Sequence, residues 1–196
     1  IPDYRRLLAG LEAGESPGAL NLHEPARPPV LAKLFADAGR PILLLTGRVD
    51  SVPAWQQALD GWLPGKVDLF RFPEPTPLPY ERGPWSELSR SRRLGVLAKL
   101  MESQHPLIPG QKEPYIIISS ARALLHKTLP RRRFLTMTRT VRMGQIIDME
   151  KLVGDWMSAG YLHVSVVEAE GQFSRRGGIL DIFPVGSAHP TRIELF

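Results

Sequence analysis

Nucleotide hydrolysis, metal chemistry and nucleophilic catalysis each need certain residue types at a set spacing, and this sequence lacks those patterns. The phosphate-binding pattern G-x-x-x-x-G-K-[S/T] and the acidic D-E-x-x motif are both absent. None of the five histidines has another histidine three or four positions away, as a helical metal-binding pair would. Ser119-Ser120 lies outside any G-x-S-x-G pattern, so we expect this pair to cap a helix that begins at Ala121. The sequence therefore predicts a chain that is not an enzyme by itself and has no cofactor or metal site.

Binding chemistry has better support, in the segment 172–183. Gly177-Gly178 suits a two-residue turn between two strands, and such a turn pairs Arg176 with Ile179. Because side chains alternate along a strand, one face of this hairpin is apolar. That face carries Phe173, Leu180 and Ile182, with Arg175 at its rim. The other face is mostly polar and carries Gln172, Ser174, Arg176, Ile179, Asp181 and Phe183.

Two interpretations of Phe183 remain open at this point. An aromatic side chain on a polar face that bears an arginine is typical of a protein-binding hot spot. With the register shifted by one residue, Phe183 would instead pack beneath a predicted helix over 149–159. The segment 191–196 also alternates and places Arg192 and Glu194 on one face. These two residues either extend a mixed-charge patch toward a partner or form an ordinary solvent-exposed ion pair.

The elements before residue 128 predict an α/β domain. Apolar runs of strand length alternate with helical patterns, which favours a parallel sheet with helical crossovers over residues 1–128. A proline-rich extended connection is expected over 73–84. The expected strands are 41–46, 67–72 and 115–119, and the expected helices are 1–15, 29–38, 53–62, 86–101 and 121–126.

Beyond residue 128 the pattern changes to that of a small α+β domain over 129–196. The alternation in Arg131–Arg139 predicts a strand with one exposed face, and a helix is expected over 149–159. Strand-like segments at 161–167, 172–183 and 191–196 predict an antiparallel sheet. Since the last of these has no stop signal, we expect the chain to be a fragment of a longer protein.

The overall composition is that of a soluble globular protein. The 196 residues are 43% hydrophobic and include no cysteine, which excludes a disulfide scaffold and thiolate chemistry. The longest apolar runs have about four residues, so no membrane span is expected and a cytoplasmic protein is favoured. The net charge of +5 is mild. The arginines at 90, 92 and 93 and at 131–133 could contact phosphates, but such runs are also typical of solvated faces.

Several segments resemble one bacterial family, the transcription-repair coupling factor (Mfd). The resemblance lies in Gly160-Tyr-Leu-His-Val164, Arg175-Arg-Gly-Gly-Ile-Leu-Asp-Ile-Phe-Pro184 and Thr191-Arg-Ile-Glu-Leu-Phe196, with a further match over 116–125. These segments are similar to the family's N-terminal module, itself similar to the excision-repair protein UvrB. The resemblance covers most of residues 29–196.

This resemblance implies a role in DNA repair. Residues 1–128 would be the first part of a degenerate helicase-like domain, and 129–196 most of the small domain that binds UvrA. The implied UvrA-binding residues are Arg176, Phe183, Arg192 and Glu194, with His163 less securely placed and Arg175 as an added charge. The full-length protein would be an ATP- and Mg-dependent DNA translocase that displaces stalled RNA polymerase from duplex DNA.

One departure from UvrB strengthens the non-catalytic interpretation. UvrB has a phosphate-binding loop before its first helix, whereas the matching stretch 21–29 has neither glycine nor lysine. Glu24 would repel phosphate there, and prolines lack the N–H donors that a phosphate needs. The resemblance thus implies an adaptor that recruits UvrA. The alternative is a duplex-DNA-binding fragment of a UvrB-like protein that uses the arginine clusters.

Overall fold

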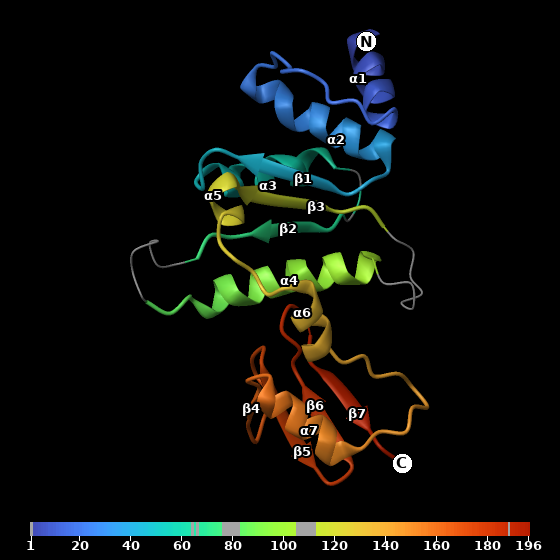
Figure 1. Ribbon diagram of the computed structural model, residues 1–196, viewed down its shortest axis with the longest axis vertical. Coiled ribbons are helices and arrows are strands. Elements are labelled where there is room, and N and C mark those ends of the chain that lie inside the picture. Colours follow the sequence, from blue (N-terminus) through green and yellow to red (C-terminus); the bar gives the residue numbers. More distant parts are fainter. Residues whose placement is uncertain (1, 64, 66, 76–82, 105–112, 188) are drawn as a thin grey trace.

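Two β-sheets, each with its own helices, make up the described part of the chain (Figure 1). The structure is a computed structural model and describes residues 2–63, 65, 67–75, 83–104, 113–187 and 189–196. Most of the expected extended connection over 73–84 lies outside these residues. A short helix α1 (Pro2–Glu12) and a 3-10 turn (Glu24–Ala26) precede the first sheet. Tyr4 of α1 donates a 2.6 Å hydrogen bond to Asp37, which ties this helix to the next one.

The first sheet has three parallel strands in the order β1-β3-β2. The strands are β1 (Ile42–Thr46), β2 (Leu69–Phe72) and β3 (Ile116–Ser120). Helices α2 (Arg27–Ala38) and α3 (Ser51–Trp62) pack on one face, and α4 (Glu87–Gln104) packs on the other. This arrangement confirms the predicted α/β architecture with a parallel sheet and helical crossovers.

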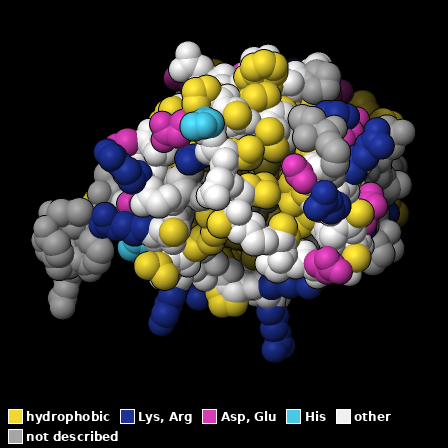
Figure 2. Space-filling view, turned by 90° about the horizontal axis from the view of Figure 1, so that it is seen from above, with side chains coloured by type: hydrophobic (Ala, Val, Ile, Leu, Met, Phe, Trp, Pro, Cys, Tyr) yellow, Lys and Arg dark blue, Asp and Glu magenta, His cyan; other side chains and the backbone are white. Residues whose placement is uncertain are grey.

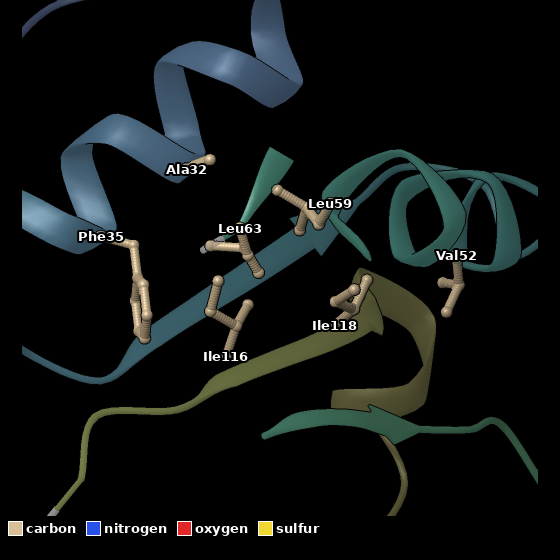
Figure 3. Packing of buried hydrophobic residues seen from close by; sticks show 7 residues of the cluster. All are labelled: Ala32, Phe35, Val52, Leu59, Leu63, Ile116 and Ile118. Carbon is tan, nitrogen blue, oxygen red and sulfur yellow. The ribbon is translucent and has the colours of Figure 1, made fainter. Parts of the chain in front are cut away.

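The central strand β3 is buried on both faces because it lies between the other two strands and beneath helices on each side. Ile116 and Ile118 join a cluster with residues of α2 and α3 (Figure 3). Ile117 faces the other way and packs with Val96 of α4. At the end of β3, the Ser120 hydroxyl accepts a 3.1 Å hydrogen bond from the Ala123 N–H and caps α5 (Ala121–Leu124), as predicted.

Residues 131–137 form a helix, so the strand predicted over 131–139 is wrong. Helix α6 (Arg131–Met137) follows Pro130, and the N–H of Thr138 donates to the carbonyl of Phe134 at 3.0 Å. The segment pairs with neither sheet in the structure. Its backbone groups therefore bond within the segment, and arginine, leucine and methionine all favour a helix.

The second sheet has the strand order β4-β5-β6-β7. Its strands are β4 (Leu162–His163), β5 (Gln172–Arg176), β6 (Ile179–Ile182) and β7 (Thr191–Glu194). The hairpin register is the one predicted, with Arg176 opposite Ile179 and Phe173 opposite Ile182. β4 pairs parallel to β5, so the sheet is mixed and the prediction of an antiparallel sheet is wrong for this pair. The connection over 164–171 carries the chain back to the starting end of β4, and β5 therefore runs in the same direction.

Helix α7 (Met149–Ser158) covers the apolar face of the second sheet. The Asp148 side chain accepts a 3.0 Å hydrogen bond from the Lys151 N–H and caps the start of this helix. Leu152 and Trp156 of α7 pack against Phe173 and Leu180 in a core of their own. The second sheet thus has a hydrophobic core that shares no residue with the clusters around the first sheet.

The part of the chain that forms the second sheet and α7 is called the second unit, and the part that forms the first sheet and its helices is called the first unit. The second unit contacts α4 of the first unit through two glycines. A Cβ atom built on Gly186 would lie 2.7 Å from the Cα of Gly95, so the two backbones meet without side chains between them. Gly186 also has a φ of +81°, a conformation that side-chain-bearing residues rarely adopt. Beside this contact, the Glu170 carboxylate accepts hydrogen bonds from the Ser91 hydroxyl of α4 and, at 2.9 Å, from the Gly186 N–H.

Replacing Gly186 with alanine is expected to lower the free energy of unfolding by about 2 kcal/mol, since it adds backbone strain and a clash with α4. Urea denaturation of the whole chain measures this change. Gly160→Ala is the matched control, because Gly160 has a φ of +92° with open space around its Cβ position. Equal losses in the two variants would show that the backbone approach to Gly95 contributes nothing.

Candidate functional site

The polar face of the second sheet gathers four of the six predicted binding residues. Asp181 lies opposite Arg192 across β6 and β7, and Ile179 lies opposite Glu194. Because paired residues share a face and side chains alternate along a strand, Arg176 and Phe183 lie on this face too. The structure therefore places Arg176, Phe183, Arg192 and Glu194 on one face of the sheet.

Phe183 follows β6 and is half-buried. Its N–H donates a 2.9 Å hydrogen bond to the Gln172 carbonyl, which continues the predicted register by one pair. Phe183 is not among the residues of the core beneath α7. The alternative in which a shifted register buries Phe183 under that helix is therefore wrong, and its ring lies on the arginine-bearing face.

Asp181 and Arg192 form a doubly hydrogen-bonded ion pair on this face. The Arg192 Nε and Nη2 atoms donate to the two Asp181 carboxylate oxygens at 2.7 and 3.0 Å. These hydrogen bonds, and the nearby charge of Arg176, hold the pKa of Asp181 below its usual value, while its partial burial opposes the shift. Both side chains are therefore charged across the physiological range, and the partner of Arg192 is Asp181 rather than Glu194.

Arg176 spans from β5 to the 164–171 connection. Its Nη2 atom donates a 2.8 Å hydrogen bond to the Ser165 carbonyl. The Gln172 side chain accepts hydrogen bonds from the Glu168 and Ala169 N–H groups, which fixes the other end of the connection. The connection and the start of β7 border a hollow of about 430 Å³. It is lined by Val166, Val167, Ser174, Arg176, Asp181, Pro190, Thr191 and Arg192.

The other two predicted residues lie on the opposite face of the sheet. His163 pairs with Phe173, and their rings stack with centroids 5.1 Å apart. Arg175 reaches α7, where its Nη1 atom lies 2.7 Å from a carboxylate oxygen of Glu150. The structure thus separates His163 and Arg175 from the surface that holds Arg176 and Phe183.

Asp181 is the residue whose role the sequence reasoning missed. The hairpin pattern placed it on the polar face but gave it no part in binding. The sequence could have indicated this role only if the hairpin and the segment 191–196 were considered together. Asp181 lies opposite Arg192 once that segment pairs with the hairpin in the observed register. Opposite charges directly across two strands are a recognised cross-strand pair.

The two arginine clusters differ in accessibility. Arg93 is buried within the packing of α4, so arginines 90, 92 and 93 do not form one basic surface. Arg131, Arg132 and Arg133 are exposed on α6, and none of the three forms an ion pair with a described residue. Over the N-terminal elements, Figure 2 shows hydrophobic side chains with acidic and basic groups interspersed, not a single basic face.

Metal ligation and membrane insertion find no support in the described residues. Within these ranges, no three histidine, aspartate or glutamate side chains come together in a way that could hold a metal ion. None of the described helices combines the length and the apolar character needed to span a bilayer.

Comparison with known proteins places the candidate surface in a recognised domain. Residues 140–196 match the family model described as UvrB interaction domain. The chain is 27% identical over 195 residues to the transcription-repair-coupling factor of Bacillus subtilis and 28% identical over 198 residues to that of Myxococcus xanthus. These alignments cover 99% and 98% of this chain but 16% of each relative.

A third relative agrees with these two, since the Staphylococcus aureus (strain USA300) transcription-repair-coupling factor is 28% identical over 172 residues, or 87% of this chain and 14% of the relative. The chain therefore spans about one sixth of the curated relatives' length. Residues 140–196 thus match the UvrB interaction domain, and the chain is similar along almost its whole length to part of the transcription-repair-coupling factors.

Proposed function

We propose that this chain is a non-catalytic adaptor module that recruits UvrA in transcription-coupled excision repair. The observation that carries the proposal is the surface of Arg176, Phe183, Arg192 and Glu194 within the residues that match the UvrB interaction domain. A half-buried aromatic ring on the same sheet face as two arginines has the composition of a protein-binding hot spot. UvrA would then contact the polar face of the second sheet, and His163 and Arg175 on the other face would lie outside a contact of that kind.

The larger activity belongs to the whole protein in this proposal. The full-length protein would use ATP and Mg²⁺ in a motor elsewhere in its sequence to translocate on duplex DNA and displace stalled RNA polymerase in the cytoplasm. Residues 1–128 would be a degenerate helicase-like domain and 129–196 the UvrA-binding domain. The start of α2 supports the loss of nucleotide binding, because Pro28 and Pro29 cannot donate N–H groups and Glu24 is negatively charged.

Binding of the 196-residue chain to purified UvrA tests the proposal. We expect Arg176→Ala and Phe183→Ala each to weaken binding by about 2 kcal/mol or more, roughly a 30-fold rise in Kd, because both remove hot-spot side chains. Isothermal titration calorimetry measures the change. Arg48→Ala and Trp62→Ala are matched controls, since both side chains are exposed on the first unit. Undiminished binding by both interface variants would contradict the proposed surface.

A second candidate function is duplex-DNA binding by the exposed arginines of α6. The exposed guanidinium groups of Arg131, Arg132 and Arg133 favour it. It requires DNA affinity that falls steeply with salt and disappears when these three residues are changed to glutamine. Salt-insensitive or absent DNA binding would contradict this second candidate, and the adaptor function would remain as the single proposal.

A further inference from the structure

The lining of the hollow on the polar face includes polar side chains that are partly or fully buried. Ser174 lines it and is only 3% exposed, although its side chain is a hydroxyl group. Asp181 lies opposite Ser174 across the hairpin and is partly buried. Val166 and Val167 form one wall, and the opposite wall is the start of β7. Arg176 and Arg192 approach this interior from two different strands.

The charges of the lining leave a net positive hollow. Two arginines and one aspartate line it, giving a formal charge of +1. Asp181 is matched by Arg192, whose Nε and Nη2 atoms each donate to one of its carboxylate oxygens. A guanidinium group has five N–H donors, so three remain on Arg192. Arg176 donates to the Ser165 carbonyl through Nη2 and also keeps N–H groups for another acceptor.

We propose that this hollow receives the carboxylate of an aspartate or glutamate side chain of the partner protein, and that Asp181 is a positioning residue that holds Arg192 in place to bind it. The inference rests on the proposed function and names the chemistry of the partner group. A single negative charge matches the net charge of the lining. A doubly charged phosphate would be repelled more strongly by the neighbouring Asp181 carboxylate.

The sign of the Asp181→Asn effect separates positioning from simple electrostatics. Removing a negative charge raises the formal charge of the lining from +1 to +2, so charge alone predicts tighter binding to an acidic group. A positioning role predicts weaker binding instead. Asparagine has no ionised carboxylate and so cannot accept hydrogen bonds from both Nε and Nη2 of Arg192 through two charged oxygens. We expect about tenfold weaker binding of the 196-residue chain to UvrA.

Two further variants test the coupling. Arg192→Lys keeps the charge but loses the side-on double hydrogen bond, so it should weaken UvrA binding by a similar factor. The double variant Asp181→Asn with Arg192→Gln should bind no more weakly than Arg192→Gln alone, since the two residues act as one unit. Arg192→Gln should also flatten the dependence of affinity on salt, as loss of a charged contact requires.

Glu150→Gln is the matched control, because Glu150 forms an acid–arginine pair at 2.7 Å on the opposite face. It should change Kd less than twofold, and thermal unfolding establishes that each variant is folded. Equal or tighter binding by Asp181→Asn, or an unchanged salt dependence in Arg192→Gln, overturns the carboxylate hollow. If Phe183→Ala still weakens binding in that case, the UvrA surface stands. Absence of UvrA binding by the wild-type chain overturns the proposed function and this inference together.

Discussion

Replacing Arg93 with alanine is expected to lower the free energy of unfolding by about 3 kcal/mol, because it removes a buried guanidinium group and leaves its carbonyl acceptors without their donor. Arg93 lies within α4 and is 3% exposed. Its Nη1 atom donates to the carbonyls of Pro73 at 2.8 Å and Ala123 at 3.2 Å, and Nη2 donates to the carbonyl of His126 at 3.5 Å. One side chain thus joins three separate segments of the first unit.

Aromatic rings complete the environment of this guanidinium group. Its central carbon lies 3.9 Å from the centroid of the Phe72 ring and 5.1 Å from that of Trp85. Burial lowers the pKa of Arg93 from its ordinary value, and no described carboxylate forms an ion pair with it. Carbonyl dipoles and ring faces therefore stabilise its charge. Alanine would leave three carbonyls without this donor and a cavity over Phe72.

Urea denaturation followed by circular dichroism measures the loss for Arg93→Ala. Arg92→Ala is the matched control, because Arg92 is the exposed neighbour on the same helix and should change the free energy of unfolding by less than about 0.5 kcal/mol. Arg93→Lys should fall between the two, since lysine keeps the charge but not the planar fork. If Arg93→Ala were no more destabilising than Arg92→Ala, the hydrogen bonds of Arg93 to the carbonyls would make no net contribution to stability.

Parallel strands of the first unit were predictable because their burial requires a pattern that few other elements share. Three consecutive isoleucines at 116–118 followed by Ser119-Ser120 predict a strand covered on both faces and a helix cap, and both are present. The segments around this strand alternate with helices of ordinary length, which favours crossovers. Local sequence was sufficient here because each signal acts within a few residues.

Elements whose form depends on a distant partner were predicted less well. Arg131–Arg139 alternates like a strand, but no sheet edge meets it and it forms α6 instead. The direction of β4 likewise depends on the path of the 164–171 connection, which places its end beside Gln172. The alternation of polar and apolar residues does not show which sheet edge a short segment will pair with. Tertiary packing determined the structure of both segments.

The candidate surface shows the same division. The Gly177-Gly178 turn fixes the register of the hairpin, so Arg176 and Phe183 could be placed on one face from local sequence. The Asp181–Arg192 pair needs the register of β7, eleven residues further along, and could not be derived from the hairpin. His163 was grouped with this surface by resemblance, although its strand position places it beside Phe173.

Replacing Phe173 with alanine is expected to lower the stability of the second unit by about 4 kcal/mol, the largest effect predicted for any single residue here. Phe173 is 1% exposed. Its ring lies 5.4 Å from that of Trp156 on α7 and 5.1 Å from that of His163 on β4, so it joins the helix to the sheet. A small core has few other contacts with which to compensate for such a cavity.

The same variant tests whether residues 129–196 form a domain of their own. The Phe173 cluster shares no residue with the clusters around the first sheet, so Phe173→Ala should lower one unfolding transition and leave another at its wild-type position. Arg93→Ala should shift the other transition and keep UvrA binding, whereas Phe173→Ala should remove that binding. Differential scanning calorimetry resolves the two transitions. A single transition shifted by both variants would mean that the contact of Gly95 with Gly186 and the Glu170 bridge couple the two units into one cooperative structure.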